Sequence, residues 1–357
     1  MRKMSRETVE IERAPRSVEP VSRVLGAFWG MWIGDALAMP AHQYMEPTLI
    51  ERDYTILNTY RLPKTPHPGS RVSRNNYTSS SDNHDIVGKQ KEFWGKGGTH
   101  PHQNLQRGQN TLTLQLATVL FESLVDNGGF DFDDYQQRYI NFMLKPEEHG
   151  DTWVEECHRN FFELYAEGRP PESCGDEDHN MSGLVIALPI LIYCAHQPKM
   201  ALQHARSAVE LTHKGKAMSS TVGILAETMS WIFKGKNIEE IIYRKIGQQA
   251  HPSFQFPFKQ WMTENEIEMI GHKLFNRSII TESLPTLTYM ALKYEYDPAR
   301  ALMINAHLGG DSCHRGAVLG AILGARAGIE IFPPEWVFEL SSFKRLDLIS
   351  DTLIKRA

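Results

Sequence analysis

The sequence predicts an all-α protein, and three observations support this fold class. Apolar residues recur at the three- and four-residue spacing of helices in successive segments between residues 21 and 308. No segment alternates apolar and polar residues over five or more positions, as a half-buried strand does. Hydrophobic residues fill 41% of the 357 positions, so the helices can bury a large core.

The predicted organisation is a tail followed by one domain. Residues 1 to 20 are expected to form a disordered N-terminal tail, because they are mostly charged or polar and lack helical periodicity. Residues 21 to 357 are expected to form a single compact multi-helix domain. Within it, residues 45 to 109 are rich in Pro, Gly, Ser, Asn and His, with only a short helical pattern around Asp85 to Trp94. A connection this long in a compact domain is usually functional.

The first predicted helix runs from Val24 to Met39 and ends at Pro40. The next is predicted from Asn110 to Leu124, with Asn110 or Thr111 as its N-cap. Further helices are predicted at residues 132–144, 151–167, 181–195, 199–212, 218–233, 236–248, 264–275, 281–294 and 297–308.

Two predicted helices carry a glycine at every fourth position. These glycines are Gly26, Gly30 and Gly34 in the first helix, and Gly316, Gly320 and Gly324 in the last, which extends to about Ala325. Residues four apart share one face of a helix, so each helix has a smooth stripe that another backbone can approach closely. We expect the two helices to pack on each other. Gly309 and Gly310 permit a sharp turn before the last helix, with Asp311 or Ser312 as its N-cap.

Composition and charge exclude several classes of function. A formal net charge of −5 with 23% charged residues gives no indication of a nucleic-acid-binding protein. We find no run of about 18 apolar residues, which a membrane-spanning helix requires. The polar stretch Met1 to Glu19 lacks the apolar segment of a secretory signal. We therefore expect a cytoplasmic protein whose partner is a small molecule, with neither nucleic acid nor membrane.

The turn before the last helix gathers three different chemical groups. Asp311, Cys313 and His314 offer an oxygen, a sulfur and a nitrogen within four residues. The ordinary interpretation is that Asp311 only caps the helix while Cys313 and His314 are core residues. His100 and His102 lie two apart in a polar loop and could bind a metal together, but no third ligand is near in the sequence, so we interpret them as surface histidines.

Two further patterns bear on metal binding. Glu155 and His158 share one face of a predicted helix, and we interpret them as part of a salt-bridged surface or a pocket wall. The cysteines are scattered and form no C-x-x-C pair, which predicts reduced thiols and neither a disulfide framework nor a zinc ribbon. They are Cys157, Cys174, Cys194 and Cys313.

Short signatures in this order resemble those of the ADP-ribosylglycohydrolase family. They are Gly26-Ala27 through Gly34-Asp-Ala-Leu-Ala-Met-Pro40, Leu211-Thr212-His213, Glu282-Ser-Leu-Pro285, and Gly309-Gly310-Asp311 with the Gly-Ala helix that follows. The similarity covers about residues 21 to 326. It implies the family's all-α fold, ADP-ribosyl substrates and, for active members, two magnesium ions.

The chain departs from the family pattern where the resemblance would place magnesium ligands. Gly108-Gln109-Asn110-Thr111 stands where the family has Thr-Asp-Asp-Thr, and Cys313 and His314 replace the later ligands of its Asp-x-Asp-Thr. Asp311 alone survives among six ligand positions. Because two adjacent magnesium ions need several anionic oxygens, we predict no dinuclear magnesium centre. His42 also replaces a family glutamate, and Asn180-Met-Ser182-Gly183 departs from the family's phosphate-binding Gly-Asn-Gly.

The sequence therefore predicts a hydrolase that cleaves a glycosidic bond of an ADP-ribosyl or related ribosyl, nucleoside-type substrate. Asp311 is the candidate base or electrostatic partner, with His42 or His314 as the acid and Cys313 as a less favoured nucleophile. The candidate substrate-binding residues are Asp35, Gln109, Asn110, Ser182, Gly183, His213, Gly309 and Gly310.

Three alternatives accompany this prediction. No cofactor is predicted, but a softer zinc site could form from Asp311, Cys313 and His314, with His42 as a further ligand. Cys313 and His314 diverge by about 100° on a helix, which counts against both binding one ion. The alternative functions are a catalytically inactive pseudoenzyme that binds an ADP-ribose-like ligand, and a structural protein related to crystallin J1.

Overall fold

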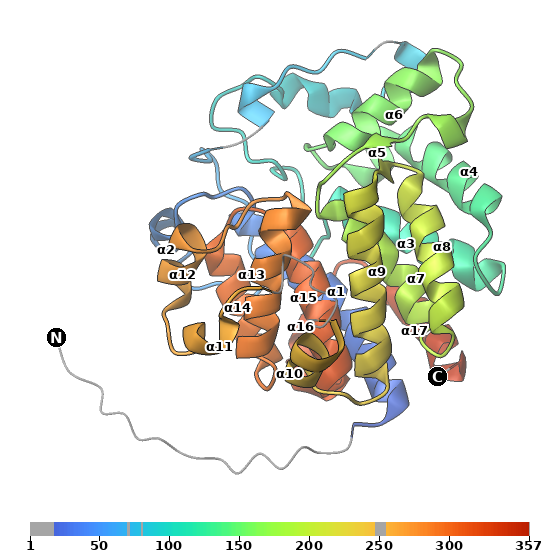
Figure 1. The fold of residues 1–357 in the computed structure, drawn as a ribbon. Helices are drawn as coiled ribbons and strands as arrows, with labels where there is room; N and C mark the ends of the chain where they lie inside the picture. The colour runs from blue at the N-terminus through green and yellow to red at the C-terminus, as the bar shows by residue number, and fades with distance from the viewer. Residues whose placement is uncertain (1–17, 70–71, 80, 247–254, 357) are drawn as a thin grey trace.

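The computed structural model describes residues 18–69, 72–79, 81–246 and 255–356, and its architecture is all α. Two long helices, α1 (Pro20–Ala38) and α15 (Ser312–Ala327), pack together along the middle of the molecule. Figure 1 shows α11 to α14 on one side of this pair and α3 to α9 on the other. The predicted fold class is therefore confirmed. The predicted tail falls almost wholly on residues 1–17, outside the described part of the chain.

The contact between α1 and α15 is made by backbone against backbone, as the glycine stripes predict. A Cβ atom placed on Gly30 would lie 2.1 Å from the carbonyl oxygen of Gly320, and one on Gly320 would lie 2.0 Å from that of Gly30. Gly34 and Gly316 make the same kind of contact one turn further along. No side chain larger than hydrogen fits at these positions, so glycine sets the spacing of the two helices.

Most predicted helices are present with small shifts of their ends. They are α3 (Leu112–Asp126), α4 (Phe132–Met143), α7 (Ser182–Tyr193), α8 (Pro198–Glu210), α9 (Lys216–Phe233), α13 (Ile280–Lys293) and α14 (Pro298–Leu308). The helix predicted at 151–167 begins later, as α6 (Glu156–Ala166), because residues 151–155 turn into the site described below. The prediction at 236–248 becomes α10 (Ile238–Glu240) and a π-helix over Ile241–Ile246.

Several elements differ from the sequence prediction. The loop-rich segment contains α2 (Pro47–Tyr54) and short 3-10 turns at Val72–Arg74, Asp82–His84 and Gly88–Phe93. Helix α12 (Glu266–His272) is interrupted by non-helical angles at Ile270 and Gly271. Elements that were not predicted include α5 (Pro146–His149), α11 (Phe258–Trp261), α16 (Pro334–Phe338), α17 (Phe343–Arg356) and the two-residue parallel strands β1 (Asp176–Glu177) and β2 (His213–Lys214).

The first helix also corrects the expectation about membrane spans. Together with the 3-10 turn η1 (Met39–Ala41), the segment Pro20–Ala41 is long and apolar enough to cross a membrane. In the folded chain, however, 94% of its apolar stretch is buried, mostly against α15. A central core helix needs the same apolar composition, so this property follows from the packing of the protein.

Candidate functional site

The site lies where the end of α1 meets the start of α15. His42 follows η1, and Asp311 is the residue before α15. Gly309 and Gly310 have φ angles of +60° and +61°, which the left-handed turn between α14 and α15 requires. The N–H of Gly310 then donates to the carbonyl of Tyr44, and the N–H of Gln43 donates to that of Gly310, at 2.6 and 2.8 Å. These two bonds bring His42 beside Asp311.

Asp311 is the centre of the site. His42 Nε2 lies 3.2 Å from its Oδ1, and His314 Nδ1 lies 2.7 Å from the same oxygen as an ion-pair contact without hydrogen-bond alignment. Its second oxygen, Oδ2, is buried and has no hydrogen-bond partner in the described chain. Although burial alone would raise it, the neighbouring His314 and His42 hold the pKa of Asp311 well below its usual range. The carboxylate is therefore kept ionised with one free oxygen.

The two histidines beside Asp311 have opposite charge preferences. Burial lowers the pKa of His42 to about 3. Burial acts on His314 in the same direction, but the charges of Asp311 and Glu155 outweigh it and raise the pKa of His314 to about 10. His42 is therefore neutral and His314 carries a positive charge between Asp311 and Glu155.

A cavity of about 220 Å³ opens above these groups. Its lining includes His42, Asp311, His314 and Glu155. A neighbouring cavity of about 400 Å³ shares part of this wall, including Glu155 and Trp153. The described structure thus has a hollow with acidic and imidazole groups at its base, which extends past Glu155.

Glu155 is the second carboxylate of the cavity, and it is 6% exposed at the N-cap position of α6. Its Oε2 accepts from the hydroxyl of Thr113 at 3.1 Å, and its Oε1 lies 3.8 Å from His314 Nε2. Burial raises the pKa of Glu155. Of the two interpretations from sequence, the pocket wall is the correct one for Glu155. His158 is buried close to Glu155 but is not part of the cavity lining, and its Nδ1 lies 3.0 Å from the hydroxyl of Tyr139.

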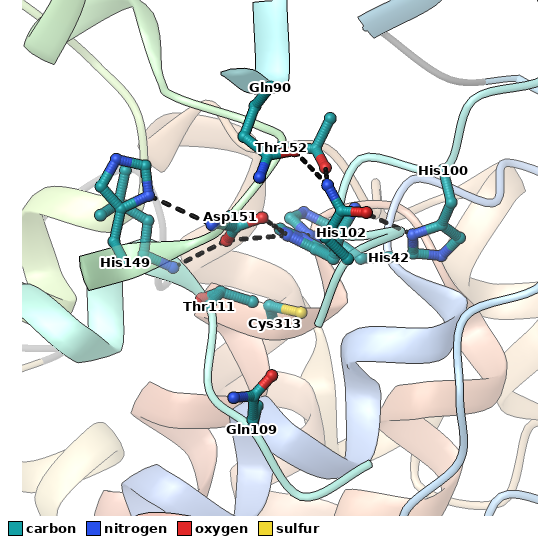
Figure 2. Close-up of polar contacts among 12 residues, drawn as sticks. His42, Gln90, His100, His102, Gln109, Thr111, His149, Asp151, Thr152 and Cys313 are labelled. Atoms are coloured by element: carbon teal, nitrogen blue, oxygen red, sulfur yellow. Dashed lines mark hydrogen bonds and ion pairs between the residues drawn. The ribbon is translucent and has the colours of Figure 1, made fainter. Parts of the chain in front are cut away.

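A second line of contacts runs from His42 away from the cavity (Figure 2). His42 Nδ1 lies 2.5 Å from His102 Nε2, and His102 Nδ1 lies 2.8 Å from Oδ1 of Asp151. The prediction that His100 and His102 are surface histidines is wrong, because their exposed fractions are 0% and 2%. The loop folds inward since His100 Nε2 bonds the carbonyl of Pro40 and His100 Nδ1 accepts from the N–H of His102.

Asp35 and Asn110 are brought together, but away from the cavity. Asp35 is fully buried and accepts from Asn110 Nδ2 at 2.9 Å, and from the N–H and hydroxyl of Thr111 at 2.9 and 2.7 Å. These bonds tie the start of α3 to α1. Gln109 is not brought to the site, since its side chain accepts from the N–H of Gln106, and Figure 2 draws no contact between it and His42 or Cys313.

The remaining predicted residues form a separate contact next to Glu155. Ser182 Oγ lies 2.9 Å from His213 Nε2, and Ser182 is near enough to Glu155 to oppose the rise in the pKa of that carboxyl that burial causes. Gly183 leaves room there, because a Cβ at this position would lie 3.2 Å from the ring of His213 and closer still to Met218. Ser182 thus connects to the cavity through Glu155, whereas Gly183 and His213 are not part of its lining.

Cys313 faces away from the cavity. Its thiol is fully buried, 3.8 Å from the carbonyl oxygen of Asp35, and burial raises its pKa well above the ordinary value. This environment does not support the nucleophilic role considered from sequence. Cys313 and His314 point to different groups, as expected for neighbours on a helix.

The residues at the positions where the family has magnesium ligands do not offer a set of hard oxygen ligands. Asn110 turns its NH₂ group to Asp35, Gln109 is engaged by Gln106, and Cys313 and His314 offer sulfur and nitrogen. Asp311 is the only carboxylate among them, and its Oδ1 already contacts two imidazoles. This donor set does not fit two adjacent magnesium ions.

Sequence reasoning missed three residues of this network. Thr113 bridges Glu155 and His314, with its hydroxyl 3.1 Å from His314 Nε2. Asp151 accepts from His102 and from the N–H of Leu112 at 2.9 Å. The third is His102, and the only pattern in the sequence that pointed to it was its two-residue spacing from His100 in the loop.

Comparisons with known proteins bear on the fold and the family. A sequence model of the family described as ADP-ribosylglycohydrolase matches residues 16–357. No curated protein matches the chain. A solved structure titled "ADP-ribosylglycohydrolase-related protein complex" superposes with a TM-score of 0.64 at 21% identity, covering 94% of this chain and 98% of the other. At that identity the likeness shows the fold.

The family match carries consequences at the level of the family. Its members are hydrolases of the ADP-ribosylglycohydrolase type, which act on ADP-ribosylated small molecules or proteins and typically use divalent metal. The match extends over nearly the whole sequence, including both glycine-striped helices and the turn at Asp311. The chain belongs to the ADP-ribosylglycohydrolase family.

Proposed function

We propose that this protein hydrolyses a glycosidic bond of an ADP-ribosyl or related ribosyl, nucleoside-type substrate in the cavity above Asp311, without the paired magnesium ions of its family. The observation that carries the proposal is the buried Oδ2 of Asp311, which has no hydrogen-bond partner among the described residues and belongs to a cavity-lining residue. A buried carboxylate oxygen without a partner is costly, and a substrate or water that binds it removes that cost.

Asp311 and Glu155 divide the chemistry of the proposed reaction. Water attacks the anomeric carbon and gives a proton to Asp311 Oδ2, whose charge also stabilises the cationic sugar. The bond to the leaving group breaks as Glu155 donates a proton to the leaving atom. Glu155 suits this role because it lies at the boundary of the two cavities, where a leaving group has room.

His314 completes the cycle in this proposal. After hydrolysis Asp311 holds a proton and Glu155 lacks one. His314 Nδ1 lies 2.7 Å from Asp311, and the Thr113 hydroxyl lies 3.1 Å from both His314 Nε2 and Glu155 Oε2, so this path can return the proton from one carboxyl group to the other. His42 is assigned a positioning role, because both of its ring nitrogens are engaged by Asp311 and His102.

Magnesium independence is supported by the donor set described above, which offers one carboxylate where two Mg²⁺ ions need several. The corresponding measurement is turnover of ADP-ribosylated protein, of ADP-ribosylated small molecules and of NAD⁺ with and without added Mg²⁺. The proposal expects no increase on adding the ion. A strict dependence on Mg²⁺ would contradict this part.

Substitution of the two carboxylates tests the catalytic assignment. Asp311→Asn is expected to lower kcat by about 10²- to 10⁴-fold for every substrate. Glu155→Gln is expected to lower kcat for leaving groups that need a proton, and much less for the nicotinamide of NAD⁺, which leaves as a neutral molecule. Equal losses with both kinds of substrate would refute the acid role of Glu155. ADP-ribose that stabilises the protein thermally without any turnover would instead indicate a binding pseudoenzyme.

A further inference from the structure

We infer that His42, His102 and Cys313 form a binding site for a single zinc-type divalent ion. The three ligand atoms are ring nitrogens of the two histidines and the sulfur of Cys313, and all lie within 4.8 Å of one another. All three residues are buried, with exposed fractions of 3%, 2% and 0%. His42 also lines the cavity, whereas His102 and Cys313 are not part of its lining, and none of the three ligands takes part in the proton transfers proposed for Asp311 and Glu155.

A count of protons indicates that a cation is missing between the two histidines. The line Asp151–His102–His42–Asp311 contains three contacts, of 2.8, 2.5 and 3.2 Å. Each contact needs one proton between its heavy atoms, but two neutral imidazoles supply only two. If His102 donates to Asp151 and His42 donates to Asp311, two nitrogen lone pairs face each other at 2.5 Å. A positive charge between them removes this repulsion.

The two carboxylates give both histidines the orientation of metal ligands. A metal-binding histidine commonly donates its second ring N–H to a carboxylate, which fixes the tautomer and makes the free nitrogen a better ligand. Asp151 does this for His102, and Asp311 does it for His42. His67 and His100 are excluded as ligands, because both ring nitrogens of each are engaged in bonds to the backbone.

Cys313 distinguishes a metal ion from a simple proton between the histidines. Its thiol has only a weak contact with the Asp35 carbonyl, at 3.8 Å, and it is available as a third ligand. Two nitrogens and one sulfur suit Zn²⁺ far better than Mg²⁺. With Zn–N bonds of about 2.0–2.1 Å in tetrahedral geometry, the two nitrogens would lie about 3.3 Å apart. The rings therefore need to separate by roughly 0.8 Å, which side-chain rotation can supply.

This assignment replaces the zinc site considered from sequence. That site combined Asp311, Cys313 and His314, but Cys313 and His314 face different neighbours across α15. Asp311 supports His42 as a hydrogen-bond acceptor, and His102 and Cys313 complete the ligand set. The inference does not rest on the proposed hydrolase activity, because metal binding is measured directly.

The test uses the full chain, stripped of metal with a chelator and titrated with Zn²⁺ or with Co²⁺ as a spectroscopic substitute. We expect one ion per chain and an ultraviolet thiolate-to-cobalt charge-transfer band. Cys313→Ser should remove that band and weaken Zn²⁺ binding by more than about 100-fold, and Asp151→Asn should weaken it by about 10- to 100-fold. Cys194→Ser is the matched control, since Cys194 is also buried but lies outside every described cluster of potential metal ligands.

Metal titration of the unmodified protein tests the site even if a variant does not fold. Absence of the cobalt–thiolate band, or of stoichiometric Zn²⁺ binding, would overturn it and leave a shared proton between His42 and His102. Unchanged Zn²⁺ affinity in Cys313→Ser would also overturn it. Loss of the band in Cys157→Ser would place the ion in one of the two groups that contain Cys157, with Glu155 and His158 or with Asp178 and His213, and would equally refute the assignment.

Discussion

The contact between α1 and α15 can be tested by the substitution Gly320→Ala. A Cβ on residue 320 would lie 2.0 Å from the carbonyl oxygen and 2.6 Å from the carbonyl carbon of Gly30. Real Cβ contacts below 3.0 Å essentially do not occur, so the helices would have to separate by more than about 1 Å. A radial gap of 0.5–1 Å already forfeits roughly a quarter to a half of each dispersion contact.

Two opposing effects set the size of the change. Alanine in place of glycine favours a helix by about 1 kcal/mol. Separation of two backbones along a buried interface is expected to cost about 4–6 kcal/mol, which places the variant among the most destabilising single substitutions. The net loss of unfolding free energy is then about 3–5 kcal/mol, a large part of the roughly 5–15 kcal/mol of a typical domain.

Equilibrium unfolding in urea, followed by circular dichroism, measures this loss. Gly223→Ala in α9 is the matched control, because its Cβ would meet only the end of the Arg206 side chain, at 3.0 Å. That flexible group can move aside, so the control should be unchanged or more stable by up to about 1 kcal/mol. If Gly320→Ala were as stable as Gly223→Ala, glycine would not be what sets the spacing of α1 and α15.

Two further predictions concern stability. Lys293 Nζ lies 2.8 Å from Glu266 Oε1, and the Tyr294 hydroxyl donates to the same carboxylate. Burial would raise the pKa of Glu266, but these bonds outweigh it and lower the pKa below its ordinary 4.5. A carboxyl whose pKa is lower in the folded state stabilises the protein above its unfolded pKa, and this stability is lost as the pH falls through the folded pKa. Glu266→Gln should therefore lose about 1–2 kcal/mol of unfolding free energy at pH 7. Its stability should also decline less steeply with acid below about pH 4.5. An identical acid profile for the two proteins would contradict this assignment. Arg315 is fully buried and donates at 2.8 Å to the carbonyl of Gly309, with further bonds to Asn305, so Arg315→Met should cost about 3–5 kcal/mol in urea unfolding, whereas the same change at exposed Arg169 should stay within about 0.5 kcal/mol.

The parts of the fold that the sequence predicted are those governed by local periodicity. The glycine stripes repeat every four residues, so the spacing around Gly30 and Gly320 is enough to indicate a close helix contact. Helix α2 was missed because it is short and buries only Ile50 and Tyr54, which is too few apolar positions to establish a period. The late start of α6 was missed for another reason, since residues 151–155 are drawn out of the helical pattern by contacts with distant parts of the chain.

The residues of the site likewise fall into those that short sequence motifs predicted and those that they did not. Asp311, His42 and His314 were indicated together because short motifs place them at helix ends that a glycine turn brings close. His102 and Asp151 lie 49 residues apart in irregular segments, where no period reports the direction of a side chain. Histidines in a polar loop are usually exposed, and only the inward bonds of the folded loop reverse that expectation.

The glycine contact between α1 and α15 also positions the residues of the site. The last pair in the stripe, Gly34 and Gly316, lies next to Asp35 on α1 and within three residues of Cys313 on α15. A backbone-to-backbone contact contains no rotatable side chains, so it fixes the distance between the two helix ends more narrowly than a contact between long side chains would. His42 and Asp311 are 269 residues apart in sequence yet lie at hydrogen-bond distance, and catalytic or metal-binding groups require placement within about 0.5 Å. The glycine contact therefore allows residues far apart in the sequence, such as His42 and Asp311, to form one site.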